Sequence, residues 1–265
     1  MTQSERNPVP LSIPGVKNGP LGGVVLYFDR LESTNSWLKH HPDYLEQEGL
    51  VIFSACQTKG RGRQGRVWQG GDPGNLFTSI VIHPKTEARL IPSFSLLIGL
   101  AVREALLECG LKGLSLKWPN DVLVKDRKIC GILCESRFER EKTPVIIAGI
   151  GLNLVGSTQS FTPEISGKVT TLQQEINEVV KPKEMLFSIL GHLNRIILDF
   201  QQGVSRKYFD LWEKNSSSIG RRILFHEIGE KINGKILGLN EYGHLRVMTG
   251  EGKLMEIHGG EIEFL

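Results

Sequence analysis

Residues 114–136 read LSLKWPNDVLVKDRKICGILCES, and this stretch decides the fold. It contains three short runs with the apolar, branched composition of strands, at 114–117, 122–124 and 129–136. Only the turn-forming segments Pro119-Asn120-Asp121 and Asp126-Arg127-Lys128 separate these runs, so they must pair largely antiparallel. The framework is therefore a sheet, and Lys117 stands at the end of one of its strands.

The same kind of pattern continues on both sides of this stretch. Further strands are predicted at 24–28, 50–55, 76–82 and 145–154. A nearly apolar helix is predicted at 94–109 and ends before Gly110, Ser33 can cap a second helix, and Pro182 opens an amphipathic third one. Helices interspersed among strands predict an α/β (α+β) domain in which helices back a mixed sheet.

Composition divides the chain into three parts. Residues 1–22 are rich in Pro, Ser, Asn and Gly without periodicity, which predicts a flexible leader. Residues 23–216 carry the α/β pattern. Residues 217–265 change to short β segments separated by Gly and Asn turns, which predicts a small separate β-barrel.

Bulk charge and cysteine usage narrow the class of protein. A net charge of +3 in 265 residues argues against DNA or a membrane as partner and is compatible with an acidic protein. We find neither a signal-peptide pattern nor an uninterrupted apolar run long enough to span a bilayer. The cysteines lack zinc-ligand spacing and are interpreted as reduced thiols of a cytoplasmic protein: Cys56, Cys109, Cys130 and Cys134.

The segment 60–66, GRGRQGR, is the most unusual local feature. Glycines let backbone amides approach an anion, while three arginines concentrate positive charge, so this loop favours phosphate or carboxylate. It also matches the dinucleotide-binding pattern GxGxxG, but that pattern requires the glycines to open a helix, and 67–74 is too rich in Gly and Pro. A solvated basic loop that contacts nucleic acid is the alternative.

The segment KWPND at 117–121 places a lysine, an aromatic ring and polar side chains where a strand ends. Such positions often carry catalytic groups, although a plain surface turn has the same composition. Joining a carboxylate to a nucleotide brings two anions together, at a cost of roughly 4 kcal/mol for charges about 4 Å apart at an effective dielectric of 20. Lys117 and the loop arginines can offset this repulsion.

Together these motifs closely resemble those of the biotin protein ligase family, in the family's order and over almost everything after residue 23. The matching pieces are Ser33-Thr34-Asn35, Gln57 with the GRGRQGR loop and Trp68, KWPND, the segment 126–135 (DRKICGILCE), Gly149-Ile150-Gly151-Leu152-Asn153, and Gly259-Gly260-Glu261-Ile262.

The resemblance implies a role for each matching residue. The biotin site would comprise Ser33, Thr34, Asn35, Gln57, Arg61, Gly62, Arg63 and Lys117. Lys117 and Arg63 would be catalytic, with Lys117 steering the biotin carboxylate and the α-phosphate of ATP. The ATP and adenylate site would comprise Arg66, Trp68, Asn120, Asp121 and Asn153, with Asp121 as a ligand of Mg²⁺. Cys130 and Cys134 would serve packing rather than nucleophilic catalysis.

The resemblance also implies a fold and a reaction. The expected architecture is a catalytic domain similar to class II aminoacyl-tRNA synthetases, followed by a small SH3-like barrel. Biotin and ATP would give biotinyl-5′-AMP, and a lysine of a biotin carboxyl carrier protein, in acetyl-CoA carboxylase or a related carboxylase, would then attack it. We expect a monofunctional ligase without repressor activity, because the leader is too short for a DNA-binding unit.

Two other functions stay open at this point. A lipoate or octanoate ligase is similar in fold, but the polar group Ser33, Thr34, Asn35 and Gln57 favours a ureido ring over an alkyl chain. A basic nucleic-acid-binding module would bind DNA or RNA with strong salt dependence. The sequence does not decide whether the chain forms a homodimer.

Overall fold

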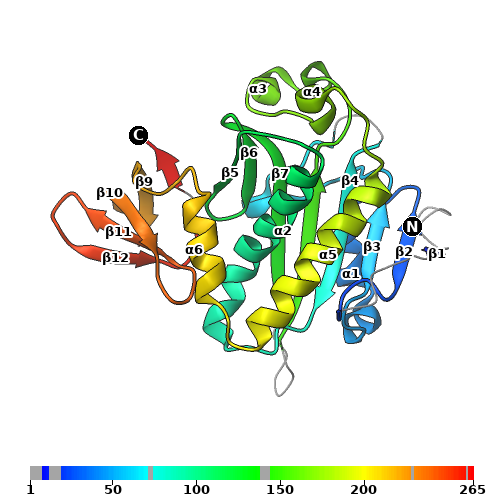
Figure 1. The fold of residues 1–265 in the computed structure, drawn as a ribbon, viewed down its shortest axis with the longest axis horizontal. Helices are drawn as coiled ribbons and strands as arrows, with labels where there is room; N and C mark the ends of the chain where they lie inside the picture. Colours follow the sequence, from blue (N-terminus) through cyan, green and yellow to red (C-terminus); the bar gives the residue numbers. More distant parts are fainter. Residues whose placement is uncertain (1–7, 12–18, 71–73, 138–143, 228–229, 261) are drawn as a thin grey trace.

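The computed structural model describes residues 8–11, 19–70, 74–137, 144–227, 230–260 and 262–265. These residues form a large sheet and a smaller one, with helices on both faces of the large sheet (Figure 1). The predicted α/β fold is therefore confirmed.

The large sheet has eight strands. In spatial order these are β1 (Val9–Leu11), β2 (Val25–Phe28), β3 (Val51–Ser54), β4 (Leu76–Ile82), β8 (Val145–Leu152), β7 (Arg127–Arg137), β6 (Asp121–Val124) and β5 (Leu114–Lys117). Only the pair β2–β3 is parallel. The sheet is therefore mixed, and the strands of the deciding stretch pair antiparallel as predicted.

Alternation along the central strands gives the sheet two apolar faces. One face, with Val25, Val51 and Ile80, belongs to the main core under α2 (Phe94–Glu108) and α5 (Pro182–Gln201). The opposite face, whose residues include Leu26, Ile52, Val81 and Ile147, packs in a separate cluster with Trp37 and Leu38 of α1 (Thr34–His40). Helices therefore cover both faces.

Helix α2 is apolar on almost every side because it lies between the sheet and α5. It ends as predicted, with Gly110 in the left-handed region at φ +77°. By length and composition, the helical segment 88–108 could cross a bilayer, whereas no such segment was predicted from the sequence. However, 67% of its most apolar 18-residue stretch is buried inside the fold. Burial in the core accounts for its apolar composition.

Several short helices were not predicted, because each is too short to show a periodic pattern. These are α3 (Pro163–Ser166), α4 (Leu172–Ile176) and the 3₁₀ turns at Pro42–Glu46, Arg63–Gly65, Ala88–Ser93 and Thr158–Ser160. The amphipathic helix α6 (Arg206–Lys214) leads to the second sheet.

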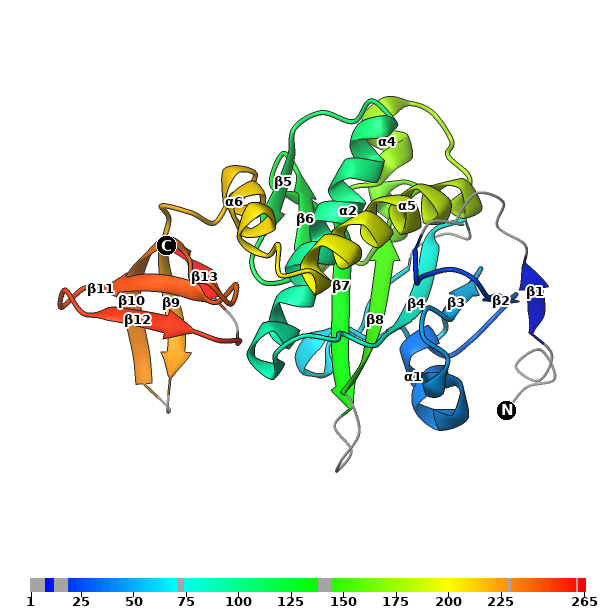
Figure 2. The same cartoon turned by 60° about the horizontal axis from the view of Figure 1, so that its bottom comes forward.

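The smaller sheet is antiparallel throughout and lies beside α6 (Figure 2). Its spatial order is β12 (Leu254–Ile257), β11 (Leu245–Thr249), β10 (Glu230–Leu239), β9 (Arg222–Glu227) and β13 (Ile262–Phe264). The expected small C-terminal β unit is confirmed, although β13 was not predicted. Residues 215–217, which lead from α6 into the smaller sheet, pair with β5 of the large sheet. Leu116 N donates to Asn215 O, and Ser217 N donates to Leu116 O. The domain boundary between 216 and 217 stays a prediction.

The prediction of a flexible leader over 1–22 needs correction. Order does not begin near Gly23, because Val9–Leu11 pairs with β2 and extends the sheet edge. Leu21 is fully buried, and its backbone N–H and C=O both hydrogen bond to the side chain of Asn194. Pairing with β2 and the contact of Leu21 with the far-off Asn194 supply this order, and local composition reveals neither. Residues 1–7 and 12–18 lie outside the described part of the chain.

Candidate active site

Three glycines of β7 and β8 open a space on the face of the large sheet that α1 covers. Gly131 and Gly151 are directly opposite each other, and Gly149 lies two residues before Gly151 on the same face. A Cβ at Gly131 or Gly151 would lie 2.7 or 2.5 Å from the Trp68 ring, and one at Gly149 would lie 2.4 Å from Asn35 Oδ1. These glycines therefore form the floor on which Trp68 and Asn35 rest.

One side of this space is a group of hydrogen-bonded polar side chains, Ser33, Thr34, Asn35 and Gln57, which we call the polar wall. Ser33 caps α1 as predicted, accepting from Ser36 N. Gln57 Oε1 accepts from the backbone N of Thr34 at 2.7 Å and from its Oγ1 at 3.2 Å. Ser33, Thr34 and Asn35 are each only 3% exposed. Helix α1 therefore begins inside the site.

Ser79 of β4, in the sheet under α1, is hydrogen bonded to the polar wall. Its Oγ lies 2.6 Å from both Thr34 Oγ1 and Asn35 Oδ1. Asn35 Nδ2 in turn donates to Leu133 O at 3.1 Å and to Glu135 at 3.0 Å. The Asn35 amide is thus fixed by partners on two strands, β4 and β7, which leaves it little freedom to rotate.

Glu135 of β7 links the polar wall to the arginine–glycine loop. Its carboxylate accepts from Lys39 Nζ at 2.6 Å and from Asn35, and lies 3.2 Å from Arg61 Nη2. Burial would raise the pKa of Glu135, but hydrogen bonds from Lys39 and Asn35 outweigh this effect and hold the pKa below its ordinary value. The carboxylate therefore stays ionised and holds Arg61.

The loop 60–68 is a small hairpin. Trp68 N donates to Gly60 O, Gly62 N donates to Arg66 O, and Arg66 N donates to Arg63 O. Gln64 and Gly65 at the tip have φ values of +53° and +75°. These glycines do not open an α-helix, because the next regular element after the hairpin in the described part of the chain is β4. This agrees with the rejection of a dinucleotide-binding motif.

The other side of the space carries cations, Arg63, Arg66, Lys117 and Lys128, which we call the cationic rim. Arg63 donates to Asn120 Oδ1 at 3.3 Å and to Gly260 O at 3.0 Å, so it joins the loop to KWPND and to the C-terminal unit. Lys117 Nζ lies 4.9 Å from the centre of the Phe264 ring. The contacts of Arg63 with Gly260 and of Lys117 with Phe264 place the C-terminal unit at the edge of the site.

Lys128 of the rim is tied to two neighbours. Its Nζ lies 2.7 Å from Asp121 Oδ1 and 5.3 Å from the centre of the Trp68 ring. The hairpin between β6 and β7 brings Lys128 to this place, because Lys125 and Asp126 turn with positive φ. Lys128 belongs to the matching segment 126–135, but no role was predicted for it from sequence.

The polar wall and the cationic rim line one cavity of about 510 Å³. Its described lining residues include five cationic side chains, those of the rim and Arg61, against two carboxylates, Asp121 and Glu263. This excess of positive charge favours anionic ligands. The cavity offers a neutral hydrogen-bonding end and a cationic end to one bound molecule or to two adjacent ones.

Comparison with known proteins gives this arrangement a family. The model of the biotin/lipoate A/B protein ligase family matches residues 27–153, and the model of the biotin protein ligase C-terminal domain matches residues 218–265. A solved structure of the Aquifex aeolicus biotin protein ligase in complex with biotin and ATP superposes with a TM-score of 0.76 at 30% identity, covering 91% of this chain and 98% of the other. The chain belongs to the biotin protein ligase family.

Curated relatives agree with this membership. The bifunctional ligase/repressor BirA of Bacillus subtilis is 28% identical over 94% of this chain and 76% of its own length. The biotin–[acetyl-CoA-carboxylase] ligase of Paracoccus denitrificans is 29% identical over 80% of this chain and 89% of its own length. The resemblance inferred from the motifs is thereby confirmed.

The structure gathers all but one of the site residues expected from the family. The cavity is lined by Ser33, Thr34, Asn35, Gln57, Arg61, Gly62, Arg63, Arg66, Trp68, Lys117, Asn120 and Asp121. Asn153 is not among the lining residues. It is 1% exposed, and its Nδ2 donates to Thr170 O. The expected contact of Asn153 with adenine therefore has no support in this geometry. Glu261 lies outside the described residues.

Sequence reasoning missed the glycine floor, Glu135 and Phe264 as parts of the site. The spacing of Gly149 and Gly151 by two residues in a strand could have shown a bare face. Burial raises the pKa of Cys134 to about 12 and raises that of Cys130 further, so both thiols stay protonated. This agrees with the interpretation of both as packing residues.

Proposed function

We propose that this chain is a biotin protein ligase that activates biotin with ATP and transfers it to a lysine of a carrier protein. The observation that supports this most directly is a single cavity that joins a neutral, preformed polar wall to a cationic rim. Biotin has the matching character, a neutral ureido ring at one end and a carboxylate at the other. Its ring faces Ser33, Thr34, Asn35 and Gln57.

The carboxylate of biotin and the α-phosphate of ATP meet at the cationic rim. Their repulsion, roughly 4 kcal/mol at about 4 Å and an effective dielectric of 20, is offset by Lys117 and Arg63. Lys117 steers both anions, and Arg63 is oriented for this by Asn120 and Gly260. The carboxylate oxygen then attacks the α-phosphorus, a P–O bond forms, and pyrophosphate leaves with the electron pair of the broken bond.

The neighbouring residues hold the nucleotide in this account. Arg66 faces phosphate, Trp68 and Asn120 border the adenylate, and Arg61 with Gly62 covers it from the hairpin. The cover keeps water from the mixed anhydride until a lysine amine of the carrier attacks its carbonyl carbon and AMP leaves.

Asp121 suits a Mg²⁺ ion that arrives with ATP. Magnesium is commonly bound by one or two carboxylates and by substrate phosphates, and it neutralises charge on the leaving pyrophosphate. Asp121 lines the cavity beside Lys128, and one of its oxygens is engaged by that lysine. The other oxygen is the proposed metal ligand.

The carrier is proposed to be the biotin carboxyl carrier protein of acetyl-CoA carboxylase or a related carboxylase. The excess of cationic side chains around the cavity fits an acidic carrier surface. Four cysteines without disulfides fit a reducing compartment, so we place the ligase in the cytoplasm.

A lipoate ligase is the second candidate, because the family model that matches residues 27–153 covers both activities. The match of residues 218–265 to the biotin protein ligase C-terminal domain favours biotin. The test is to incubate the chain with ATP, Mg²⁺ and either biotin or lipoate, and to identify the acyl-adenylate by mass spectrometry. Biotinyl-5′-AMP alone supports the proposal, and lipoyl-AMP alone overturns it.

A further inference from the structure

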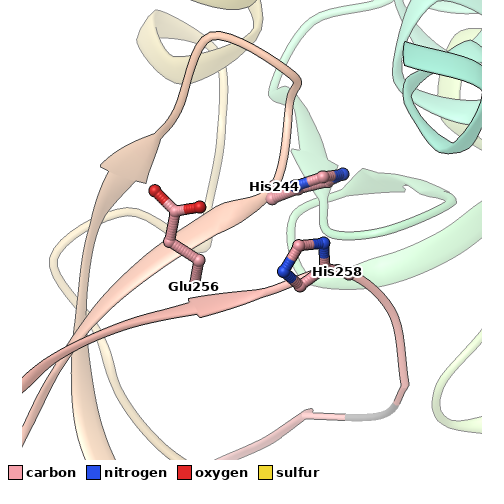
Figure 3. A group of neighbouring side chains, drawn as sticks. All are labelled: His244, Glu256 and His258. Carbon is pink, nitrogen blue, oxygen red and sulfur yellow. The ribbon is translucent and has the colours of Figure 1, made fainter. Parts of the chain in front are cut away.

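Three side chains of the smaller sheet converge outside the candidate active site. His244, Glu256 and His258 each offer one potential ligand atom, and these three atoms lie within 4.8 Å of one another. The imidazole centroids of His244 and His258 are 4.1 Å apart. Figure 3 shows the two rings facing each other with the Glu256 carboxylate beside them. None of the three residues lines the cavity.

Strand pairing produces this convergence. Strands β11 and β12 pair antiparallel, with Leu245 opposite Ile257 and Arg246 opposite Glu256. One further step in the same register places His244 opposite His258. Opposite residues share a face, as do residues two apart on one strand, so His258 and Glu256 project toward the same side as His244.

His244 is a buried polar group that is not fully satisfied. It is only 5% exposed, and apart from an interaction with the backbone of Arg89 its ring nitrogens have no hydrogen-bond partner, so at least one of them is unsatisfied. Leaving a buried polar group unsatisfied is unfavourable, so such a group calls for an explanation. Coordination of an ion would satisfy one of its ring nitrogens.

Asn240 holds the other parts of the cluster in position. Its Nδ2 donates to Glu256 Oε2 at 2.8 Å. Its Oδ1 accepts from the backbone N of Tyr242 and of His244, each at 2.9 Å. Side chains that bind metals are commonly oriented by such outer hydrogen bonds. Asn240 therefore orients the carboxylate and shapes the turn that presents His244.

We propose that His244, Glu256 and His258 bind a divalent transition-metal ion with the ligand preference of Zn²⁺. Two imidazoles and one carboxylate suit Zn²⁺, and three protein ligands leave a fourth position for water. Zinc bonds of about 2.0–2.1 Å in a tetrahedron place ligand atoms about 3.4 Å apart. Glu256 and His258 are exposed, and a change in their side-chain torsion angles would bring the three atoms from within 4.8 Å to this distance.

The position of the site gives the ion a structural role. A Cβ at Gly243 would lie 2.8 Å from the Ser93 side chain, so the turn before β11 packs closely against the start of α2. On the other strand, His258 directly precedes Gly259 and Gly260, and Gly260 O accepts from Arg63 at 3.0 Å. The ion would join this packed turn to the strand end that leads toward the cavity.

Zinc titration of the full chain without a polyhistidine tag tests the proposal. Calorimetry should detect one Zn²⁺ per chain, and His258→Gln should weaken binding by at least about 100-fold. Co²⁺ should give the visible absorption of a tetrahedral site, and Glu256→Gln should abolish that spectrum. Mg²⁺ in excess should not displace Zn²⁺, because it prefers oxygen ligands.

The matched control is His192→Gln, which removes another histidine near a carboxylate, Glu108, on the helical side of the protein. This variant should bind Zn²⁺ like the unmodified chain. Absence of Zn²⁺ binding, or unchanged binding in both His258→Gln and Glu256→Gln, would overturn the proposal. An equal loss in His192→Gln would do so as well. Unfolding of each variant in urea should show that its fold is intact.

Discussion

The polar wall and the cationic rim lie in one cavity but are built in opposite ways. Members of the polar wall sit at the start of α1 or just after β3 and are bonded to one another, to Ser79 and to Glu135. Members of the cationic rim lie on hairpins and strand ends, and Arg66 is exposed. The first region is fixed before a ligand arrives, whereas the second surrounds space that anions would fill.

This difference suggests a division of labour. A preorganised neutral wall loses little entropy on binding and suits recognition of an uncharged ring. Cations around a partly open space contribute most where negative charge gathers during the reaction. Substitutions in the rim should therefore act mainly on kcat, and changes beneath the wall should act mainly on biotin affinity and stability.

The largest effect is expected for Lys117→Ala. Removing the ammonium that steers both anions should lower kcat for biotin-dependent pyrophosphate release by about 10²–10³-fold, in the range known for loss of one transition-state donor. The control is Lys112→Ala, an exposed lysine just before the same strand and outside the cavity lining. If Lys117→Ala behaves like Lys112→Ala, the rim does not act as described.

Arg63→Ala should have the next largest effect. It loses the charged hydrogen bonds to Asn120 and Gly260 that orient the guanidinium, and a net loss equal to one such bond, about 1.5–3 kcal/mol, corresponds to a kcat loss of roughly 10–100-fold. Arg63→Lys should recover only part of the rate, because an ammonium cannot reproduce the planar fork. Full recovery in Arg63→Lys, measured by the same pyrophosphate assay, would contradict this role.

Gly149→Ala tests the floor under the polar wall. The new Cβ would lie 2.4 Å from Asn35 Oδ1, so the variant should lose about 1–3 kcal/mol of unfolding free energy and should bind biotin about tenfold more weakly. Urea unfolding and calorimetry measure the two effects. The control is Gly191→Ala in α5, where the new Cβ would meet nothing within 4 Å. This variant should gain up to about 1 kcal/mol of unfolding free energy. Equal behaviour of the two alanine variants would remove the argument for the floor.

Glu135→Gln should have the smallest effect. It should lower the free energy of unfolding by about 1 kcal/mol at neutral pH, because solvent screens the ion pairs of Glu135. Because the folded state holds the pKa of Glu135 below its ordinary value of 4.5, the carboxylate stabilises the fold above that pH. This contribution is lost as the pH falls through the lowered pKa. The difference in urea midpoint between the unmodified chain and Glu135→Gln should therefore shrink in acid. A difference that grows in acid would be inconsistent with the assigned ion pairs.

Much of the fold and site could be predicted from sequence because the signals are local. Short apolar, β-branched runs predicted the strands, Ser33 predicted the start of α1, and six ordered motifs indicated the family. The strand Val9–Leu11 escaped because its partner lies in β2 and its own composition is that of a leader. The role of Asn153 stays a prediction, and its position after a strand does not reveal that its side chain hydrogen bonds to Thr170 O.

The remaining features depend on contacts between distant segments. Glu135 meets Lys39 and Arg61 only after β7 and α1 pack together. His244 and His258 show no metal-ligand spacing in sequence, and the register of β11 and β12 brings them together. No local pattern contains this register.

The division between wall and rim is tested most directly by titrating biotin into the chain in the absence of ATP. Our account predicts that biotin binds, that Thr34→Val weakens binding about tenfold by removing a hydroxyl from the wall, and that Arg66→Ala leaves the affinity within about twofold. Unchanged affinity in Thr34→Val together with a large loss in Arg66→Ala would contradict it.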